Sequence, residues 1–197
     1  TFLGEIIRGI QEVQLDTGHS FEVMVQPYVS EEFQRAQNAM GSTRVNGVIM
    51  CNTTVEESRE LEAMHLRAPM VFFNRYSPKY SSVYSDFSTV GAQIAQLFHG
   101  KGYRHVALVG TGQNVSNHVK REKGFLTACA QLGMSARLWT AGPNGDSAAY
   151  GYQLTKELIQ AGGVPDGIFY SADEYAMGGV RACAELGVAL PQDMGII

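Results

Sequence analysis

Residues 165–178 form the most informative stretch of the chain, Pro165-Asp166-Gly167-Ile168-Phe169-Tyr170-Ser171-Ala172-Asp173-Glu174-Tyr175-Ala176-Met177-Gly178. A short apolar run leads to Asp173 at its carboxyl end, and small residues that suit a closely packed helix follow. Beyond that helix, the turn Pro191-Gln192-Asp193 precedes another apolar run. A strand, a helix and a second strand in this order are typical of a parallel sheet, whose strands carry ligand sites at their carboxyl ends. The stretch therefore indicates a ligand pocket on an α/β sheet.

Apolar runs of strand length recur along the whole chain, and residues with helical spacing separate them. Apolar side chains at Val90, Ile94, Leu97 and Phe98, for example, follow the pattern of a helix with one buried face. This alternation predicts an α/β protein with parallel sheets flanked by helices. The expected strands are residues 21–25, 45–50, 70–73, 105–109, 167–170 and 194–197.

A stretch rich in Tyr, Ser, Pro and Lys, residues 75–82, interrupts this alternation. We interpret residues 85–88 as a crossover between two lobes, an N-terminal lobe of residues 1–86 and a C-terminal lobe of residues 87–197. The cleft between two such lobes would be the ligand site. The chain begins within a helical pattern and ends on an apolar run, so we expect the first strand of the N-terminal lobe and the remainder of the C-terminal lobe to lie outside it.

Composition narrows the class of protein. Of the 197 residues, 45% are hydrophobic and 17% charged, and no apolar run has the eighteen or so residues of a membrane span. The formal net charge of −4 includes no basic run, so this stretch offers no electrostatic basis for tight nucleic-acid binding. The cysteines are odd in number and widely spaced, which fits a reducing cytoplasm, and the helical apolar patterns around two of the three, Cys129 and Cys183 but not Cys51, predict buried thiols.

Patterns typical of enzymes are weak or missing. Gly110-Thr111-Gly112 follows an expected strand, but Val115 stands where a dinucleotide loop needs a third glycine. The five histidines are scattered without metal-site spacing and are expected mostly on the surface, and no Gly-x-Ser-x-Gly elbow occurs. The sequence favours a binding module over an enzyme and predicts no catalytic residue, cofactor or metal.

Short segments in a characteristic order and spacing carry a resemblance over almost the whole chain. They are Phe2–Ile10, Arg44–Ile49, Val71–Arg75, Asp86 with Gly91, Gly102–Ala107, Arg121 with Gly124 and Phe125, Pro165–Phe169, Asp173 with Ala176 and Gly178, and Leu190–Asp193. By these segments the chain resembles the effector-binding core of the LacI/GalR family of bacterial transcription repressors.

The resemblance implies a two-lobed, periplasmic-binding-protein-like fold that forms a homodimer or a dimer of dimers and binds a small effector in its cleft. A helix-turn-helix domain, expected to precede this chain, would bind operator DNA. The family also places an acidic stretch just after the final strand, beyond Ile197, so one expected pocket carboxylate has no counterpart here. The alternative is a periplasmic solute-binding protein of a sugar transporter, which shares this fold. Two motifs favour the repressor over it: Pro191-Gln192-Asp193 and the Arg121 motif.

Arg121 is the first candidate for effector contact. A guanidinium can donate a planar pair of hydrogen bonds to hydroxyls or a carboxylate, and the family's arginine three residues before Gly-Phe does so. The alternative is a solvated arginine at the start of a helix, beside Lys120 and Lys123.

Two carboxylates are further candidates. Asp86 follows an expected strand at the crossover, where it could accept hydrogen bonds from hydroxyl groups of a ligand or cap the helix that begins near Ser88. Asp173 lies at the carboxyl end of a strand and could contact the effector, act as an N-cap, or do both.

The remaining candidates are an aromatic side chain and two amides. The resemblance places Phe2 against the effector and gives Asn117 a polar contact, while Asn52 follows the second strand in a loop that would face the pocket. Both asparagines could instead serve loop geometry.

Two departures from the family pattern bear on the effector. Ala172 stands where the family often has an asparagine, and residues 145–149 lack the aromatic side chain that many members stack on sugars or purines. Tyr150 or Tyr152 could replace that aromatic group. We expect a small polar effector, such as a sugar or sugar derivative.

Overall fold

The computed structural model describes residues 2–28, 31, 45–51, 53–65, 68–112, 115–140 and 147–197. The chain divides into two compact units, residues 1–38 and 39–197. In the first unit, helix α1 (Phe2–Thr17) ends at Gly18, whose φ of 68° suits glycine, and residues 19–28 form no strand. The strand predicted at residues 21–25 is therefore wrong, because a strand needs a neighbour and no described residue pairs with this segment.

The first sheet of the larger unit consists of β1 (Val48–Cys51), β2 (Met70–Phe73) and β3 (Ser81–Val83), in the order β1-β2-β3 with parallel pairing. Helix α3 (Val55–Ala63) connects β1 to β2 and begins with a capping box at Thr54. Strand β3 was not predicted, because two of its three residues are serines and only backbone pairing with β2 defines it.

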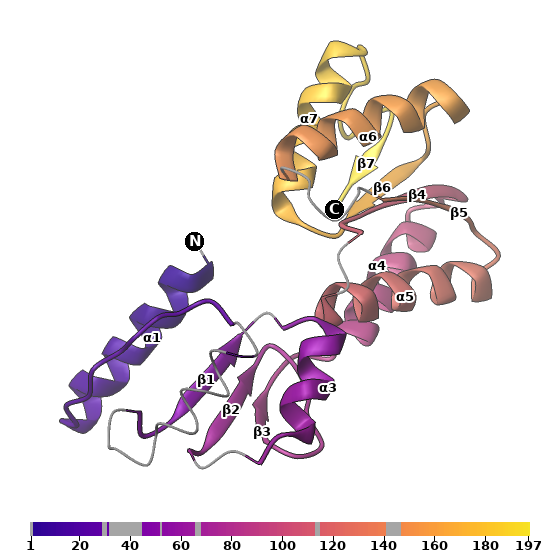
Figure 1. Ribbon diagram of the computed structural model, residues 1–197. Helices are drawn as coiled ribbons and strands as arrows, with labels where there is room; N and C mark the ends of the chain where they lie inside the picture. Colours follow the sequence, from indigo (N-terminus) through magenta and orange to yellow (C-terminus); the bar gives the residue numbers. More distant parts are fainter. Residues whose placement is uncertain are drawn as a thin grey trace. The chain divides into compact units, whose positions relative to one another are not determined.

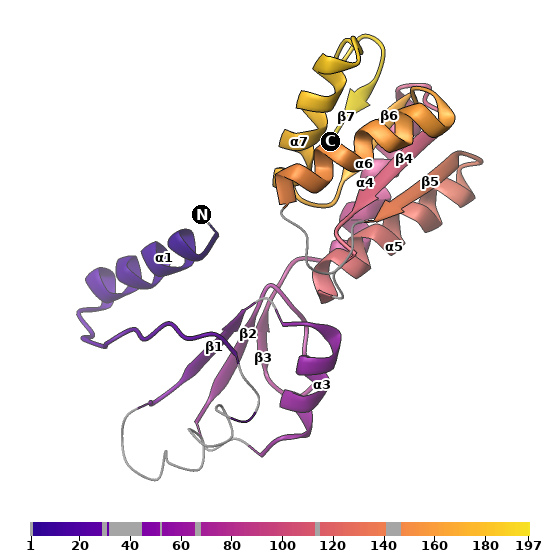
Figure 2. The same cartoon turned by 45° about the horizontal axis from the view of Figure 1, so that its top comes forward.

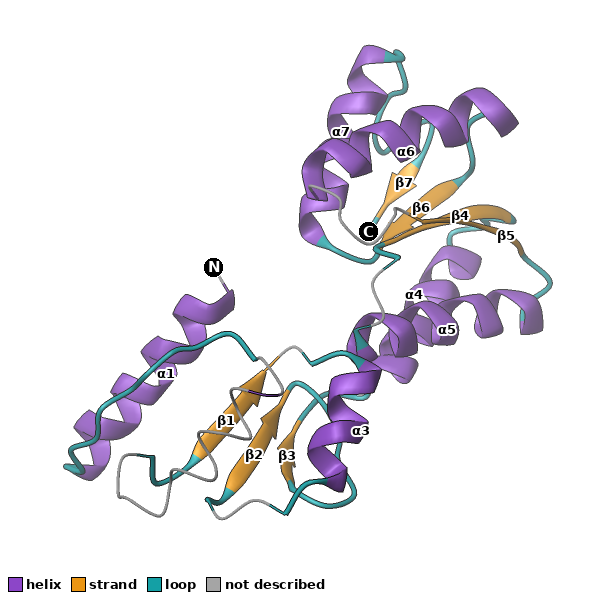
Figure 3. Cartoon of the chain, in the orientation of Figure 1, coloured by secondary structure: helices purple, strands orange, loops and turns teal. Residues whose placement is uncertain are grey.

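The second sheet consists of β4 (His105–Gly110), β5 (Ser135–Thr140), β6 (Gly167–Tyr170) and β7 (Gly195–Ile196). Its order is β5-β4-β6-β7, and every described pair is parallel (Figure 3). Strand β5 was not predicted, because this edge strand mixes polar and apolar residues and is half exposed, with Leu138 50% exposed. Buried β4 and β6 are continuous apolar runs, which parallel strands covered on both faces require.

Four helices cover the second sheet, two on each face (Figures 1 and 2). Helices α4 (Phe87–Gly100) and α5 (Ser116–Gln131) pack side by side on one face, where Phe98, Phe125 and Phe169 form a buried aromatic cluster. Helices α6 (Ser147–Gly162) and α7 (Asp173–Glu185) cover the other face. The predicted fold class, α/β with parallel sheets flanked by helices, is confirmed.

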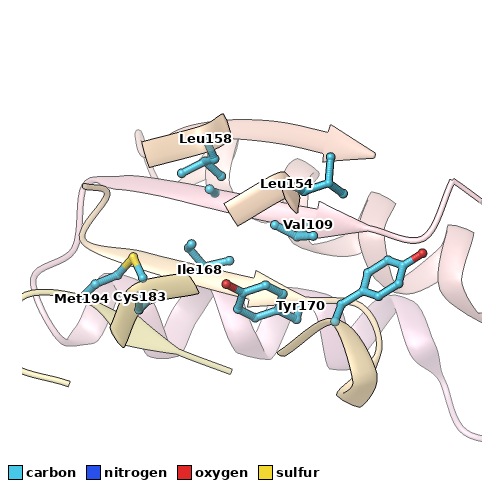
Figure 4. Close-up of a cluster of buried hydrophobic side chains, with 9 residues drawn as sticks. Val109, Leu154, Leu158, Ile168, Tyr170, Cys183 and Met194 are labelled. Carbon is cyan, nitrogen blue, oxygen red and sulfur yellow. The ribbon is translucent and has the colours of Figure 1, made fainter. Parts of the chain in front are cut away.

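The core beneath α6 and α7 joins side chains from both helices to the sheet (Figure 4). Ile168 of β6, Leu158 of α6 and Cys183 of α7 are fully buried there. Each large aliphatic side chain in such a core contributes about 1.5–3 kcal/mol. Cys183 and Cys129 are buried thiols, and burial raises the pKa of Cys129 to about 11. Both are therefore core residues, as predicted, whereas Cys51 is half-buried.

Glycines set the close approach of the paired helices. A Cβ at Gly91 of α4 would lie 2.0 Å from the carbonyl oxygen of Arg121, and one at Gly124 of α5 would lie 2.2 Å from that of Ser88. No side chain fits at either position, so the backbones of α4 and α5 touch and the register of Arg121 against α4 is fixed. Among the described helices, none is long and apolar enough to cross a membrane.

Candidate functional site

Several polar side chains converge at the carboxyl edge of the second sheet. Thr111 directly follows β4 and Ser171 directly follows β6, and both residues are buried. Helices α5 and α7 begin at this same edge, because each follows one of these strands. Parallel α/β sheets bind ligands at this edge, where helix N-termini and loop side chains meet.

Arg121 lies within this edge. Its Nη2 donates a hydrogen bond to the carbonyl oxygen of Ser171, and its guanidinium carbon lies 5.8 Å from the centre of the Phe87 ring. Its side chain is half-buried, and burial lowers the pKa of Arg121, while the carboxylates of Glu122 and Asp173 act in the opposite direction. The solvated arginine considered as the alternative is thus wrong.

At this edge, two buried polar atoms have no hydrogen-bond partner within the described parts of the chain. They are Nε of Arg121 and Oγ of Ser171. Buried polar groups are almost always satisfied in folded proteins. The Nε–H is a donor and the serine hydroxyl can donate or accept, so this edge offers both kinds of hydrogen bond.

A second set of contacts surrounds Thr111. Its Oγ1 lies 3.2 Å from Nδ1 of His118, its amide donates to Oε1 of Glu122 at 3.4 Å, and its carbonyl accepts from the Tyr175 hydroxyl at 3.4 Å. His118 is half-buried, so the expectation of surface histidines is wrong for this residue. Burial, followed by the charge of Arg121, lowers the pKa of His118, which favours the neutral ring.

Asp86 is the N-cap of α4, as one of its two predicted roles required. Its Oδ1 accepts hydrogen bonds from the amides of Ser88 and Thr89 at 3.1 and 3.3 Å, and its Oδ2 accepts one from the Thr89 hydroxyl at 2.6 Å. These bonds, with the Thr89 hydroxyl first, lower the pKa of Asp86. The carboxylate remains exposed and directly precedes Phe87, which contacts Arg121.

Asp173 does not cap α7. The N-cap is Ala172, which has no side chain to cap the helix, and Asp173 is the first helical residue. The N-cap role considered for it is therefore wrong. Its exposed carboxylate is close enough to Arg121 to affect the pKa of that side chain. A carboxylate in the first turn also favours the positive end of the helix dipole.

The other candidates are less clearly placed. Asn117, in the first turn of α5, uses Oδ1 to accept a hydrogen bond from the His118 amide at 2.9 Å. Phe2 starts α1 in the smaller unit, and its side chain lies outside the described part of the structure, as does the whole of Asn52. Ligand contact by any of the six candidates stays a prediction.

The two tyrosines considered as substitutes for a missing aromatic group have other contacts. Tyr152 donates to Oε2 of Glu185 at 2.5 Å and lies beneath the cations of Lys156 and Arg181, on the paired helices α6 and α7. Tyr150 packs against the core formed with α6 and α7. The contacts of Tyr152 lie on α6 and α7, whereas Tyr150 is close enough to Tyr175, which bonds Thr111, to contribute after burial to the raised pKa of Tyr175.

The structure adds residues that the sequence did not single out: Thr111, His118, Glu122, Ser171 and Tyr175. A usable signal existed for some of them. Thr111 and Ser171 each end an apolar strand, and His118 precedes Arg121 by three residues, which places both on one helix face. The contact of Tyr175 with Thr111, 64 residues away, has no such signal.

A hollow of about 330 Å³ lies at the opposite, amino edge of this sheet, near His105, Ser135 and Arg137. Asp166 lines it and accepts hydrogen bonds from the amides of Arg104 and His105 at 2.6 and 2.8 Å. These bonds fasten the loops that enter the strands, which is a structural role. Within the described residues, no three His, Cys, Asp or Glu side chains are grouped as a metal site would require.

Comparison with known proteins identifies the family. The family model described as a periplasmic binding protein-like domain matches residues 95–197, more than half of the chain. The chain belongs to the periplasmic binding protein-like domain family. Among curated proteins, this periplasmic binding protein-like domain is 24% identical to catabolite control protein A of Priestia megaterium, across 100% of the chain and 60% of that protein. The chain thus spans well under two thirds of that relative's length.

Solved structures show the same fold. A LacI family transcription regulator from Clostridium acetobutylicum matches 98% of this chain and 72% of its own chain, with a TM-score of 0.86 and 24% identity. The lac repressor dimer bound to operator and the anti-inducer ONPF matches 98% of this chain and 68% of its own chain, with a TM-score of 0.79 and 20% identity. The predicted resemblance to LacI/GalR regulators and the periplasmic-binding-protein-like fold are confirmed.

Proposed function

We propose that this chain is the effector-binding core of a ligand-responsive bacterial transcription regulator of the repressor type. Residues 1–86 and 87–197 would form two lobes with a small polar effector between them, and a helix-turn-helix domain outside this chain would bind the operator. The protein would act in the cytoplasm, by binding and not by catalysis. The effector would favour one of two conformations and so change operator affinity, a coupling of typically ~1–3 kcal/mol.

Arg121 is the observation that carries this proposal. Its half-buried guanidinium is held at the carboxyl edge by the carbonyl of Ser171, while Nε has no partner among the described residues. An arginine that is held through Nη2 and has an unpaired Nε–H is oriented to donate a hydrogen bond to an oxygen atom of a ligand. The lac repressor, which shares the fold, was solved with an anti-inducer bound, and this supports an effector for the present chain as well.

The charges near Arg121 favour an uncharged effector rich in hydroxyl groups. Asp86 and Asp173 are exposed carboxylates, and Glu122 and Glu174 lie close enough to act on the pKa of Arg121 or His118. Carboxylates accept hydrogen bonds from hydroxyls and repel anions. A sugar or polyol fits this set better than a sugar phosphate or a dicarboxylate does.

An exposed apolar strip on α7 supports the proposed homodimer. Met177 is 69% exposed and Val180 is 43% exposed, and the three-residue spacing places them beside each other on the face of α7 that points away from buried Tyr175. Exposed apolar side chains that adjoin each other on a helix are typical of protein interfaces. A second copy of the chain would cover this strip.

Thermal-shift measurements with neutral sugars, polyols, sugar phosphates and nucleosides test the proposal. A true effector raises the unfolding temperature in proportion to RT ln(1 + [L]/Kd). Arg121→Met should abolish the shift given by the best compound, while Lys123→Met, on the exposed face of the same helix, should preserve it. Stabilisation that survives Arg121→Met would contradict the assigned site, and sugar phosphates stabilising more than sugars would contradict the neutral effector.

The alternative, a periplasmic solute-binding protein, predicts a different assembly and partner. Sedimentation of the full-length protein should give a dimer for a repressor and a monomer for a transport receptor. A gel-shift assay with DNA from upstream of its own coding region should show a complex only for the repressor. A monomer that binds no DNA would replace the proposed function with the transport role.

A further inference from the structure

Arg75 is a largely buried arginine that follows strand β2 of the first sheet, distant in sequence from the Arg121 edge. It follows Asn74, whose φ of 64° makes the chain turn sharply at the end of β2. The side chain of Arg75 is only 13% exposed and lies 5.2 Å from the centre of the Phe72 ring. Burial lowers the pKa of Arg75, and the carboxylate of Glu62 on α3 counteracts this, at 3.8 Å from Nη2.

The guanidinium of Arg75 binds the turn that follows β1. Nη1 donates to Oγ1 of Thr53 at 3.1 Å and to the carbonyl oxygen of Thr54 at 3.2 Å. One nitrogen atom thus bonds to two consecutive residues that precede Arg75 by 22 and 21 positions. Such charge-assisted bonds are about twice as strong as neutral ones, so they constrain the turn firmly.

The same turn is fixed from its other side by α3. The Thr54 amide donates to Oε2 of Glu57 at 2.7 Å, the Glu57 amide donates to Oγ1 of Thr54 at 3.2 Å, and Thr53 Oγ1 lies 2.8 Å from Ser58 Oγ. The amide and hydroxyl of Thr54 are thus bonded to Glu57 of α3, and its carbonyl oxygen is bonded to Arg75. Because these bonds fix the turn, the turn can itself fix the position of a segment that is bonded to it.

What the turn contacts is the start of α5. Thr54 and Val115 form an isolated antiparallel bridge, and Val115 is the N-cap of α5. Its carbonyl oxygen accepts the first helical bond, from the amide of Val119 at 3.1 Å. The two turns that follow carry His118 and Arg121. The backbone of Thr54 therefore joins the first sheet to the helix that presents the proposed effector contacts.

We propose that Arg75 is a positioning residue that holds Thr54 against Val115 and thereby sets the start of α5. This inference rests on the proposed function for its link to effector affinity, but the contact itself is testable without a ligand. Without Arg75, the turn would lose its two charge-assisted bonds and would separate more readily from Val115. Separation would leave α5 without a fixed beginning.

Cysteine cross-linking measures this contact directly. The pair Thr54→Cys and Val115→Cys is introduced with Cys51→Ala, since Cys51 is the nearest thiol and the other two cysteines are buried. Bridge partners in antiparallel pairing have Cα atoms about 4.5–5.5 Å apart, which suits a disulfide. Adding Arg75→Met should slow oxidation to the disulfide about tenfold or more, because two bonds to a charged group are lost. Arg59→Met, an exposed arginine on α3, is the matched control and should leave the rate unchanged.

The link to the effector site is tested by rescue. If D-ribose or D-glucose stabilises the unmodified protein, Arg75→Met should weaken that binding about tenfold. In the double-cysteine protein, oxidation should restore the affinity and reduction should abolish the restoration. A role confined to overall stability would not be restored by a tether at this single point. If neither sugar binds even with Arg75 present, the proposed sugar effector fails, while the cross-linking rate still decides the role of Arg75.

Arg75→Lys guards against loss of folding. Lysine keeps the charge near Glu62 but cannot reproduce the fork geometry of arginine. If Arg75→Met does not fold, Arg75→Lys should show slower cross-linking with native circular dichroism. A cross-linking rate equal to that of the Arg75 protein in whichever variant folds would overturn the inference.

Discussion

The hydroxyl of Tyr170 donates a hydrogen bond to Oγ1 of Thr155, 2.8 Å away in the core between β6 and α6. The direction follows from counting protons, because the single hydroxyl proton of Thr155 goes to the carbonyl oxygen of Gly151 at 2.6 Å. Thr155 is fully buried and Tyr170 is 5% exposed. Burial raises the pKa of Tyr170, so the donor stays protonated at any physiological pH.

Replacing Thr155 with Val should destabilise the protein by about 1–3 kcal/mol, because the Tyr170 hydroxyl would be buried without an acceptor. Tyr170→Phe should cost less, since Thr155 keeps its bond to Gly151. The double variant should be more stable than the sum of the two single effects predicts. Urea unfolding monitored by circular dichroism measures all three. Equal losses for the two single variants would contradict the assigned direction.

Gly91→Ala should destabilise the protein by about 1–3 kcal/mol and weaken effector binding, because the new Cβ would lie 2.0 Å from the Arg121 carbonyl oxygen. Gly100→Ala, in the same helix, meets nothing within 4 Å and should be neutral or slightly stabilising. Thermal unfolding of the two variants gives the comparison. Because alanine favours a helix more than glycine does, a loss of stability in Gly100→Ala as large as that in Gly91→Ala would contradict the assignment of the Gly91→Ala loss to contact with α5.

His118 should make stability depend on pH. Burial and the Arg121 charge lower its folded pKa below the ordinary value of about 6.5, although Glu174 opposes them. Below that pH, the unfolded chain binds a proton that the folded chain excludes, so the free energy of unfolding falls until the folded pKa is passed. His118→Gln should flatten this slope in the range below about pH 7. His105→Gln, an exposed control, should retain it, and an unchanged slope in His118→Gln would refute the assignment.

Met177→Glu should shift sedimentation from dimer to monomer, because a carboxylate would be placed in the centre of the proposed α7 interface. The helix should remain folded, since Met177 is 69% exposed and supports no core contact. Leu97→Glu, on α4 with 50% exposure, provides the control and should remain dimeric. Dissociation by Leu97→Glu but not by Met177→Glu would relocate the interface to α4.

Where strands are buried on both faces, apolar runs predicted them well. Residues 70–73 and 167–170 were predicted with the bounds that β2 and β6 have. Edge and short strands were missed, because β5 has neither a continuous apolar run nor a strict alternation and β3 depends on its pairing with β2. Residues 21–25 show the opposite error, an apolar run without a described partner strand.

For the candidate site, the expected place of a residue in the fold was a better guide to its contacts than the residues next to it in the sequence. Asp173 was expected at the carboxyl end of a strand and Arg121 as an effector contact, and the structure brings them within electrostatic reach of each other. Asp86 was given two possible roles, and the structure establishes the helix cap while contact with an effector stays a prediction. His118 was missed although its spacing from Arg121 places both on one helix face, because its half-buried contact with Thr111 depends on the fold.

The sequence by itself determined the alternation of helices with the buried strands, the buried helix faces and the family resemblance, because hydrophobic periodicity and short motifs are properties of neighbouring residues. Only the tertiary structure decided which side chains meet. Arg121 reaches Ser171 across 50 positions, and Arg75 reaches Thr53 across 22. Such contacts depend on the order of the strands in the sheet and on how closely glycine lets α4 approach α5. Neither the strand order nor this helix spacing is encoded in a local sequence pattern.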